Sequence, residues 1–308
     1  MNPDYHRPAL FTESIDLLAI REGGTYVDAT FGGGGHSAGI LQKLGREGRL
    51  IAFDKDTDAH TNRLEDARLQ LIKTDFKFIE NVLREAGIEE VDGILADLGI
   101  SSHQVDVAER GFSFRFVAEL DMRMDRENDL TAAQVLAEYT QSELQRIFRD
   151  YGEIRQANRI ATAITSARRT APVDTTDTLR SVIATTVKAS NLNKILTLIY
   201  QALRIEVNGE LTALPKLLEG GLRMLKPGGR MAIISYHSLE DRMVKRFFRY
   251  GNLAGEDQRD FYGNSLNPLT RITRRAVQPS DLEVEQNPRA RSARLRVAER
   301  KAPPPETK

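Results

Sequence analysis

Short apolar runs alternate with amphipathic segments along the first hundred residues. Segments with apolar residues at helical spacing lie between these runs, including 12–20, with Thr12 as the expected N-cap, and 37–44. A polar helical stretch is expected to follow Asp54 as far as Leu69. Strands that alternate with helices predict right-handed crossovers and a parallel sheet covered on both faces. The predicted strands are residues 25–29, 48–54, 71–74 and 91–98.

The alternation stops between residues 113 and 207, where helical spacing alone predicts an inserted all-helical domain. Its expected helices are 131–151, 153–169 and 175–189, and Thr131 and Thr175 are the expected N-caps. We expect this insertion to recognise substrate, with a passive lid or an interface as the structural alternative. The sheet domain then comprises 1–112 and 208–300, between an extended start at 3–8 and a disordered tail at 301–308. The second part is expected to contain a helix at 201–225, a tight turn at 226–230, a strand at 231–236, a helix at 239–250, and terminal strands at 270–277 and 293–298.

The composition sets outer bounds on the class of protein. With 308 residues, 40% of them hydrophobic and 29% charged, the chain is ordinary for a soluble globular protein. Lys+Arg and Asp+Glu both number 44, which excludes only a uniformly basic protein. Without a signal peptide or an apolar run of about 20 residues, the expected location is cytoplasmic, with no membrane partner. Because cysteine is absent, disulfides, thiolate metal sites and cysteine nucleophiles are excluded, and no metal site is expected.

The stretch YVDATFGGGGH, residues 26–36, carries the first candidate chemistry. Four consecutive glycines, Gly32 to Gly35, stand between a predicted strand and a predicted helix. Glycine backbone can approach a ligand closely, and the amides of the following helix point at whatever lies there. A flexible surface turn is the alternative, but the placement between strand and helix disfavours it.

Acids at the ends of successive predicted strands carry the second signal. Asp28, Asp54, Asp75 and Asp97 fall at these ends, and open α/β sheets bind ligands at the corresponding edge. A single strand-end Asp is more often a cap or a turn former, but four in register favour a site. Asp54 follows Gly34 by 20 residues, a spacing at which a carboxylate can accept the ribose hydroxyls of an adenosine ligand.

Two ligand classes fit these patterns. Gly33, Gly35 and Ala38 loosely satisfy the G-x-G-x-x-G/A fingerprint of a dinucleotide site. Asp28 ahead of Gly32 and Gly34 instead suits a ligand without a pyrophosphate but with an amino-acid portion, such as S-adenosylmethionine. The residues alone leave both classes open.

Seven longer motifs give the chain a specific resemblance. In order, they are FGGGGHS, DLGISSHQ, ERGFSF, LDMRMD, QALRIEVNGEL, LKPGGRMAIISYHSLEDR and NPRARSARLR. Over nearly its whole length the chain resembles the bacterial small-subunit ribosomal RNA (cytosine-N(4))-methyltransferase family, known as RsmH or MraW. The resemblance implies a Rossmann-like class I methyltransferase with a doubly wound, mostly parallel sheet. It also implies S-adenosylmethionine as cofactor and a cytosine amine in the ribosomal decoding centre as methyl acceptor.

The resemblance also implies which residues bind the cofactor. Asp54 would hold ribose hydroxyls, Phe76 would lie against the adenine face, and Asp97 with Gln104 would meet polar edges of the ligand. Asp97 is in addition the candidate catalytic residue. The sequence departs from the family pattern at His103, at Val107 and in residues 195–200, which bear on the substrate side. The implied cofactor positions are Gly34, Gly35, His36, Asp54, Phe76, Asp97 and Gln104.

Arginine clusters mark the expected RNA-binding surface. Candidate phosphate contacts in the insertion are Arg155, Arg159, Arg168 and Arg169, although solvated helices carry arginine just as readily. A denser terminal group comprises Arg271, Arg274, Arg275, Arg289, Arg291, Arg294 and Arg296. The expected partner is ribosomal RNA of the small subunit, and a homodimer stays open. A non-catalytic ribosome-assembly factor and a nicotinamide-dependent oxidoreductase are the alternative functions; a hydrolase triad of His237, Ser238 and a neighbouring acid is disfavoured, because no nucleophile elbow is present.

Overall fold

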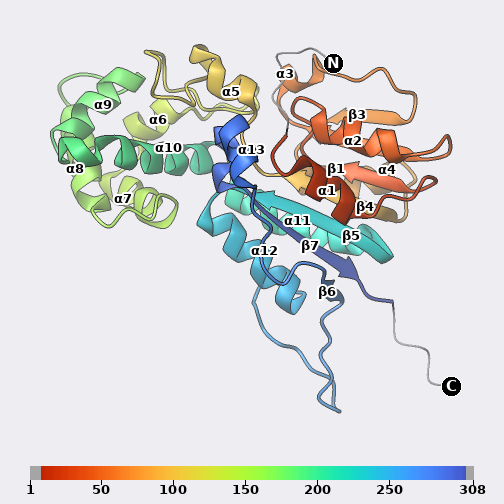
Figure 1. The fold of residues 1–308 in the computed structure, drawn as a ribbon. Helices are drawn as coiled ribbons and strands as arrows, with labels where there is room; N and C mark the ends of the chain where they lie inside the picture. The colour runs from red at the N-terminus through yellow and green to blue at the C-terminus, as the bar shows by residue number, and fades with distance from the viewer. Residues whose placement is uncertain (1–7, 303–308) are drawn as a thin grey trace. The chain divides into compact units, whose positions relative to one another are not determined.

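A computed structural model describes residues 8–302, and the chain divides into two compact units (Figure 1). The sheet unit comprises Met1–Gly99 and Leu211–Lys308, and the helical unit comprises Ile100–Glu210. The predicted insertion had its boundaries at 113 and 207, so the helical unit begins earlier than the sequence suggested. Apart from Pro8, Lys301 and Ala302, the predicted extended start and disordered tail lie outside the described residues.

The sheet unit is built on seven strands in the order β3-β2-β1-β4-β5-β7-β6. Strands β1 to β5 are parallel, whereas β7 runs antiparallel to both β5 and β6. The predicted doubly wound, mostly parallel sheet is therefore confirmed. The strands are β1 Thr25–Asp28, β2 Arg49–Asp54, β3 Leu69–Lys73, β4 Val91–Asp97, β5 Leu225–Ser235, β6 Leu269–Arg271 and β7 Arg294–Arg300.

The central strands are apolar throughout because both faces of the sheet are covered. Val27, Ile51 and Ile94 belong to one buried cluster, and their strand neighbours Leu50 and Leu95 belong to the other. Alternate residues of a strand point to opposite faces, so a strand buried on both sides needs a continuous apolar run. The helices that flank this sheet are α1 Phe11–Leu18, α2 Gly35–Lys43, α4 Ile79–Glu85, α11 Glu210–Met224 and α12 Ser238–Tyr250.

Three local predictions for the sheet unit are wrong. Helix α1 begins after Leu10, which has a φ of 52°, so Thr12 is not its N-cap. The polar helix expected as far as Leu69 is only the four-residue α3, Thr57–His60. Residues 226–230 are not a separate turn but lie within β5, where the register with β4 shifts. Gly228 has a φ of 77° at this irregularity, a conformation that glycine tolerates.

The helical unit has its own core, formed largely by α6 to α10. Thr131 and Thr175 cap α6 and α9 through capping boxes, as predicted. Two long predicted helices are each divided: residues 131–151 by a further capping box at Thr140, and residues 201–225 by Gly209, which has a φ of 60°. The helices are α5 Ser102–Asp106, α6 Ala132–Glu138, α7 Gln141–Asp150, α8 Ala157–Ala167, α9 Thr176–Ala184 and α10 Leu192–Asn208.

Candidate functional site

The carboxyl ends of three neighbouring strands carry aspartates. Asp28 ends β1, Asp54 ends β2 and Asp97 ends β4. Strand β1 pairs with both β2 and β4, and the chain order reverses between β1 and β4. This reversal is the point where open α/β sheets bind their ligands. The fourth predicted acid, Asp75, instead accepts a hydrogen bond from the Lys77 amide at 2.9 Å and caps the short 3-10 helix Phe76–Phe78.

The glycine loop is tied to the strand ends by its backbone. The Phe31 amide donates to the Phe53 carbonyl at 2.8 Å, and the Gly32 amide donates to Oδ2 of Asp54 at 2.7 Å. Gly32 and Gly34 have φ values of 51° and 76°, in the region that favours glycine. A Cβ on Gly34 would lie 2.9 Å from the Phe31 ring, whereas a Cβ on Gly32 would meet nothing within 4 Å. Gly32 therefore presents bare backbone to open space, as a close-fitting ligand requires.

Asp28 holds this loop in place rather than facing a ligand. Its side chain is fully buried, accepts a hydrogen bond from Ser37 Oγ at 2.6 Å, and accepts a second from the Thr30 amide at 3.1 Å. Burial raises the pKa of Asp28 to about 7, and the hydrogen bond from Ser37 opposes this rise. Asp28 is thus a structural link between β1 and α2, and the ligand contact suggested by its spacing from Gly32 is wrong for this carboxyl group.

Asp54 fixes the glycine loop and keeps capacity for a ligand. One carboxylate oxygen accepts from the Gly32 amide, and the other accepts from the Asp56 amide at 2.8 Å. Burial raises the pKa of Asp54, with the hydrogen bonds from Asp56 and Gly32 opposing the rise. A carboxylate oxygen has two lone pairs, so each oxygen can accept one more hydrogen bond. This arrangement suits a pair of hydroxyl donors.

Asp97 is the strand-end acid with the most connections across the edge. Its amide donates to Thr30 Oγ1 at 2.7 Å, and its Oδ1 accepts from the Gly99 amide at 3.3 Å. The Tyr236 hydroxyl, directly after β5, donates a hydrogen bond to the carboxylate. Burial raises the pKa of Asp97 to about 6, against the effect of Tyr236. The side chain keeps 20% of its surface exposed, so it is ionised at neutral pH and accessible to a ligand.

Thr30 and Tyr236 belong to the candidate site, and the sequence reasoning did not single them out. Both lie within the quoted motifs or directly beside them, Thr30 next to FGGGGHS and Tyr236 in the β5 motif. Their contacts to Asp97 join segments far apart in the chain, which spacing alone does not reveal. Tyr236 also packs its ring against Gly99, where an added Cβ would lie 2.7 Å from the ring.

His36 is a packing residue in this structure. Its ring is 4% exposed and stacks on Phe11, with the ring centroids 6.1 Å apart. Burial lowers the pKa of His36 to about 4, and a hydrogen bond with the Ala9 backbone opposes this change. The ring is therefore neutral near pH 7, and the 3.9 Å separation between its Nδ1 and Oδ2 of Asp97 is not an ion pair. Its backbone amide, in the first turn of α2, is the group of His36 best suited to a ligand.

The remaining predicted cofactor residues lie in different units. Phe76 follows β3 and is half-buried against the core beneath the sheet. Gln104 belongs to the helical unit, where its Oε1 accepts from the Ser101 amide at 3.0 Å in a capping box. Its role in cofactor binding therefore stays a prediction.

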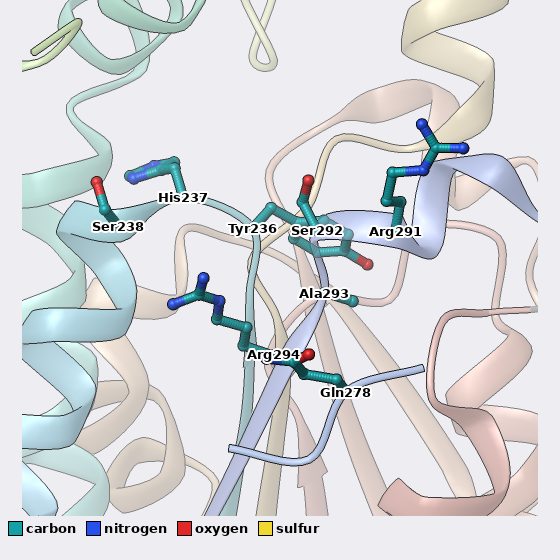
Figure 2. Close-up of a pocket in the computed structure, with 8 residues that line it drawn as sticks. All are labelled: Tyr236, His237, Ser238, Gln278, Arg291, Ser292, Ala293 and Arg294. Carbon is teal, nitrogen blue, oxygen red and sulfur yellow. The ribbon is translucent and has the colours of Figure 1, made fainter. Parts of the chain in front are cut away.

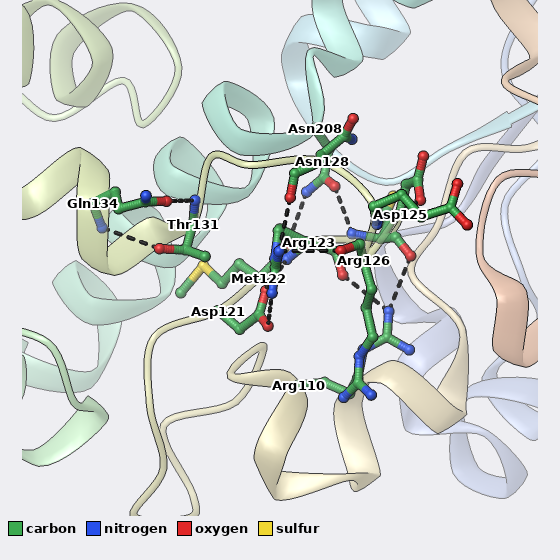
Figure 3. A network of polar contacts seen from close by, with 12 residues as sticks. Arg110, Asp121, Met122, Arg123, Asp125, Arg126, Asn128, Thr131, Gln134 and Asn208 are labelled. Carbon is green, nitrogen blue, oxygen red and sulfur yellow. Dashed lines mark hydrogen bonds and ion pairs between the residues drawn. The ribbon is translucent and has the colours of Figure 1, made fainter.

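A buried network of hydrogen bonds gives a structural role to the polar residues of several motifs (Figure 3). Arg110 is 1% exposed and donates from Nη2 to the carbonyls of Arg123 and Met124 at 2.9 and 3.1 Å. Asn208 Nδ2 donates to the Met122 carbonyl at 2.8 Å, and its Oδ1 accepts from the Met124 amide at 2.7 Å. These contacts join ERGFSF, LDMRMD and QALRIEVNGEL within the helical unit, so the named side chains serve its architecture.

The candidate RNA-binding arginines separate into exposed and structural groups. In the helical unit Arg155, Arg159 and Arg169 are exposed, whereas Arg168 donates to the Leu136 carbonyl at 2.6 Å. In the sheet unit Arg296 is held by Asp241 at 2.7 Å. The exposed terminal arginines are Arg271, Arg274, Arg275, Arg291 and Arg294. Separately, none of the helices within residues 8–302 has the length and apolar character needed to cross a membrane.

Comparison with known proteins extends over almost the whole chain. A sequence model described as the MraW methylase family matches residues 4–301. The Ribosomal RNA small subunit methyltransferase H of Flavobacterium johnsoniae is 54% identical over 297 residues, which cover 96% of this chain and 98% of that protein. The protein of the same name from Bacteroides thetaiotaomicron is 46% identical, with the same two coverages. The crystal structure of a rRNA methylase from Streptococcus thermophilus aligns with 94% of this chain and 95% of its own chain, at 14% identity and a TM-score of 0.42.

Proposed function

This chain belongs to the MraW methylase family, and we propose on that basis that it methylates the exocyclic amine (N4) of a cytosine in small-subunit ribosomal RNA. The methyl donor is S-adenosylmethionine. Substantial identity to proteins named as methyltransferases of the small-subunit RNA carries the proposal. Family membership disfavours both the nicotinamide-dependent oxidoreductase and the non-catalytic assembly factor. A ribosomal RNA substrate also favours the cytoplasmic location expected from the sequence.

The polar groups at the carboxyl ends of the strands are suited to binding S-adenosylmethionine. Asp54 has acceptor capacity for two ribose hydroxyls, Gly32 leaves open space beside its backbone, and Asp97 offers an ionised, accessible carboxylate. We assign ribose binding to Asp54, the ligand-facing backbone to Gly34, Gly35 and the His36 amide, and adenine contact to Phe76. When bound, this cofactor supplies a methyl group on a positively charged sulfur.

Asp97 is our candidate for contact with the reacting amine. The exocyclic nitrogen of cytosine delocalises its lone pair into the ring, so an acceptor for its proton favours attack on the methyl group. Asp97 is ionised above about pH 6 and lies at the end of β4, with Tyr236 and the Gly99 amide holding its carboxylate. It can therefore accept a hydrogen bond from the amine and receive the proton that the amine loses on methylation. Methylation at ring carbon 5 normally needs a cysteine thiolate, and the chain has no cysteine.

We assign RNA recognition to exposed arginines in both units. Arg155, Arg159 and Arg169 in the helical unit and the exposed terminal arginines of the sheet unit are available to phosphates. Arg168 is a less accessible candidate, because it is only partly exposed and its Nη1 donates to a backbone carbonyl.

Mass spectrometry of ribosomal RNA tests the proposed reaction. Small-subunit RNA from cells with and without the protein is digested to nucleosides, and purified protein is supplied to the RNA that lacks the modification. We expect an N4-methylated cytidine only where the protein is present. Recovery of 5-methylcytidine, or transfer that persists in a variant carrying both Asp54→Ala and Asp97→Ala, contradicts the proposal.

A further inference from the structure

A polar pocket of about 210 Å³ lies where the carboxyl end of β5 meets the start of β7 (Figure 2). Its lining includes Tyr236, His237 and Ser238 after β5, and Arg291, Ser292 and Arg294 before and at the start of β7. Strand β5 pairs with β4, and Tyr236 donates a hydrogen bond to Asp97. The pocket therefore shares one wall with the carboxylate assigned to the reacting amine.

Arg294 is the second of two arginines that contact the Asp241 carboxylate at this pocket. Asp241, in the first turn of α12, accepts from Arg296 Nε at 2.7 Å and from Arg296 Nη2 at 3.1 Å. Burial opposes ionisation of Asp241, but Arg296 and Arg294 hold the pKa of this carboxyl below its usual value. Arg296 therefore forms a bidentate ion pair with Asp241. Arg294, whose Nη1 lies 3.2 Å from Oδ2, is a second cation on the same carboxylate, so one of the two positive charges is not compensated by Asp241.

Arg294 and Arg296 also differ in how much of each side chain is exposed to solvent. The Arg296 side chain is 11% exposed, whereas the Arg294 side chain is 48% exposed. Figure 2 shows the Arg294 guanidinium extending toward the side of the pocket that carries His237 and Ser238. Arg296 thus serves the fold, and Arg294 presents its charge to the pocket.

The acidic neighbours of the pocket differ from the groups that line it. Glu240 is 2% exposed and lies beside His237, with 3.1 Å between Oε1 and Nε2. Among the described residues, the pocket lining includes two guanidinium groups, from Arg291 and Arg294, and no carboxylate. The hydroxyl groups of Ser238 and Ser292 add neutral polar groups to the lining. A surplus guanidinium among hydroxyl groups is suited to an oxyanion, and phosphate in particular.

We propose that this pocket binds a backbone phosphate of the RNA strand next to the target cytosine, with Arg294 as its main contact. The inference rests on the proposed function, which supplies RNA as the substrate. A phosphate held here fixes the strand on the Tyr236 side of Asp97. Because phosphate contacts set register rather than read sequence, the pocket would position the target base without identifying it.

Steady-state methyl transfer to small ribosomal subunits that lack the modification tests the pocket. We expect Arg294→Ala to raise KM for the subunits about tenfold, the scale of one lost charge-assisted contact, with little change in kcat. The slope of log KM against log salt concentration should become shallower by about 0.7 to 0.9, as expected for one lost phosphate contact. Arg294→Lys keeps the charge and should retain the wild-type slope with a smaller rise in KM.

Arg63→Ala is the matched control, because it removes one exposed guanidinium outside the terminal arginine region. A KM for Arg294→Ala equal to that of Arg63→Ala overturns the pocket assignment while leaving the proposed function intact. Absence of methyl transfer by the wild-type protein instead overturns the proposed function. Asp241 keeps Arg296 in the Arg294→Ala variant, so we expect its thermal midpoint and its affinity for S-adenosylhomocysteine to be unchanged. If the thermal midpoint or the cofactor affinity of Arg294→Ala falls, the Arg294→Lys variant becomes the test. A wild-type salt slope for Arg294→Lys then supports phosphate binding in the pocket, and a shallower slope overturns it.

Discussion

Replacing Tyr236 with phenylalanine isolates one hydrogen bond at the proposed active site. The substitution keeps the ring that packs against Gly99 and removes only the hydroxyl that donates to Asp97. Since that donor favours the ionised carboxylate, its loss raises the pKa of Asp97 further above the ordinary value. The proposed mechanism uses ionised Asp97, so the variant should need a higher pH to reach full activity.

The size of the effect follows from the strength of the contact. A hydrogen bond to a charged group contributes about 1.5–3 kcal/mol, which corresponds to about one to two pKa units. Starting from about 6, the pKa of Asp97 moves to about 7–8. At pH 7 the ionised fraction, and with it kcat, then falls about twofold to tenfold and recovers by about pH 9.

Other groups near Asp97 do not produce this shift. Burial holds the pKa of His36 at about 4, so its ring stays neutral over the range measured. Glu240 acts on Asp97 through its charge and is unchanged by the substitution. An upward shift in the pKa of Asp97 in this variant is therefore due to the loss of the Tyr236 hydroxyl.

The assay is the pH dependence of kcat at saturating RNA and cofactor. Tyr26→Phe is the matched control, because it removes a buried hydroxyl that accepts from the Arg21 amide at the amino end of β1. We expect the acidic limb to move upward for Tyr236→Phe and to stay in place for Tyr26→Phe. An equal loss of kcat at every pH, with an unmoved limb, would refute the assigned role of Tyr236.

The other aspartates give two further predictions. Asp54→Asn should weaken binding of S-adenosylhomocysteine by about 2–4 kcal/mol in calorimetry, because charge-assisted acceptors for two hydroxyls are lost; unchanged affinity would remove Asp54 from the site. Burial raises the pKa of Asp28 to about 7, so the folded chain binds this proton more tightly than the unfolded chain, and stability falls as the pH rises from about 4 to about 7. Asp28→Asn should flatten that dependence in denaturant unfolding at pH 5 and pH 8, by on the order of 1–4 kcal/mol. An unaltered slope would show that Asp28 is not its source.

The strands were predictable because their burial is local information in the sequence. A strand covered on both faces must be apolar at every position, and β2 and β4 carry that signal. Helix boundaries were less predictable, because apolar spacing continues across a short break. The break at Thr140 did have a sequence signal, a Thr followed three residues later by Glu143, and so did Gly209 after α10.

The sequence predicted where the candidate site lies, but not which of its aspartates face a ligand and which have structural roles. Glycines after the first strand and acids at strand ends locate the edge from sequence alone. Which acid faces a ligand depends on contacts that spacing does not encode. Asp28 accepts a hydrogen bond from Ser37, Asp75 accepts one from the Lys77 amide, and Asp97 accepts one from Tyr236, which directly follows β5. These pairings arise from strand order, so they required the structure.

The charges at this edge decide between the two ligand classes that the glycine pattern left open. Three carboxyl groups, those of Asp28, Asp54 and Asp97, meet at adjacent strand ends, and the charges of Asp54 and Asp97 both raise the pKa of Asp28. Such an edge repels the pyrophosphate of a dinucleotide, because like charges in a partly buried site interact strongly. A cofactor with a positively charged sulfur and an ammonium group relieves the same repulsion. The carboxylates that make the edge unfavourable when empty therefore favour S-adenosylmethionine over a nicotinamide dinucleotide.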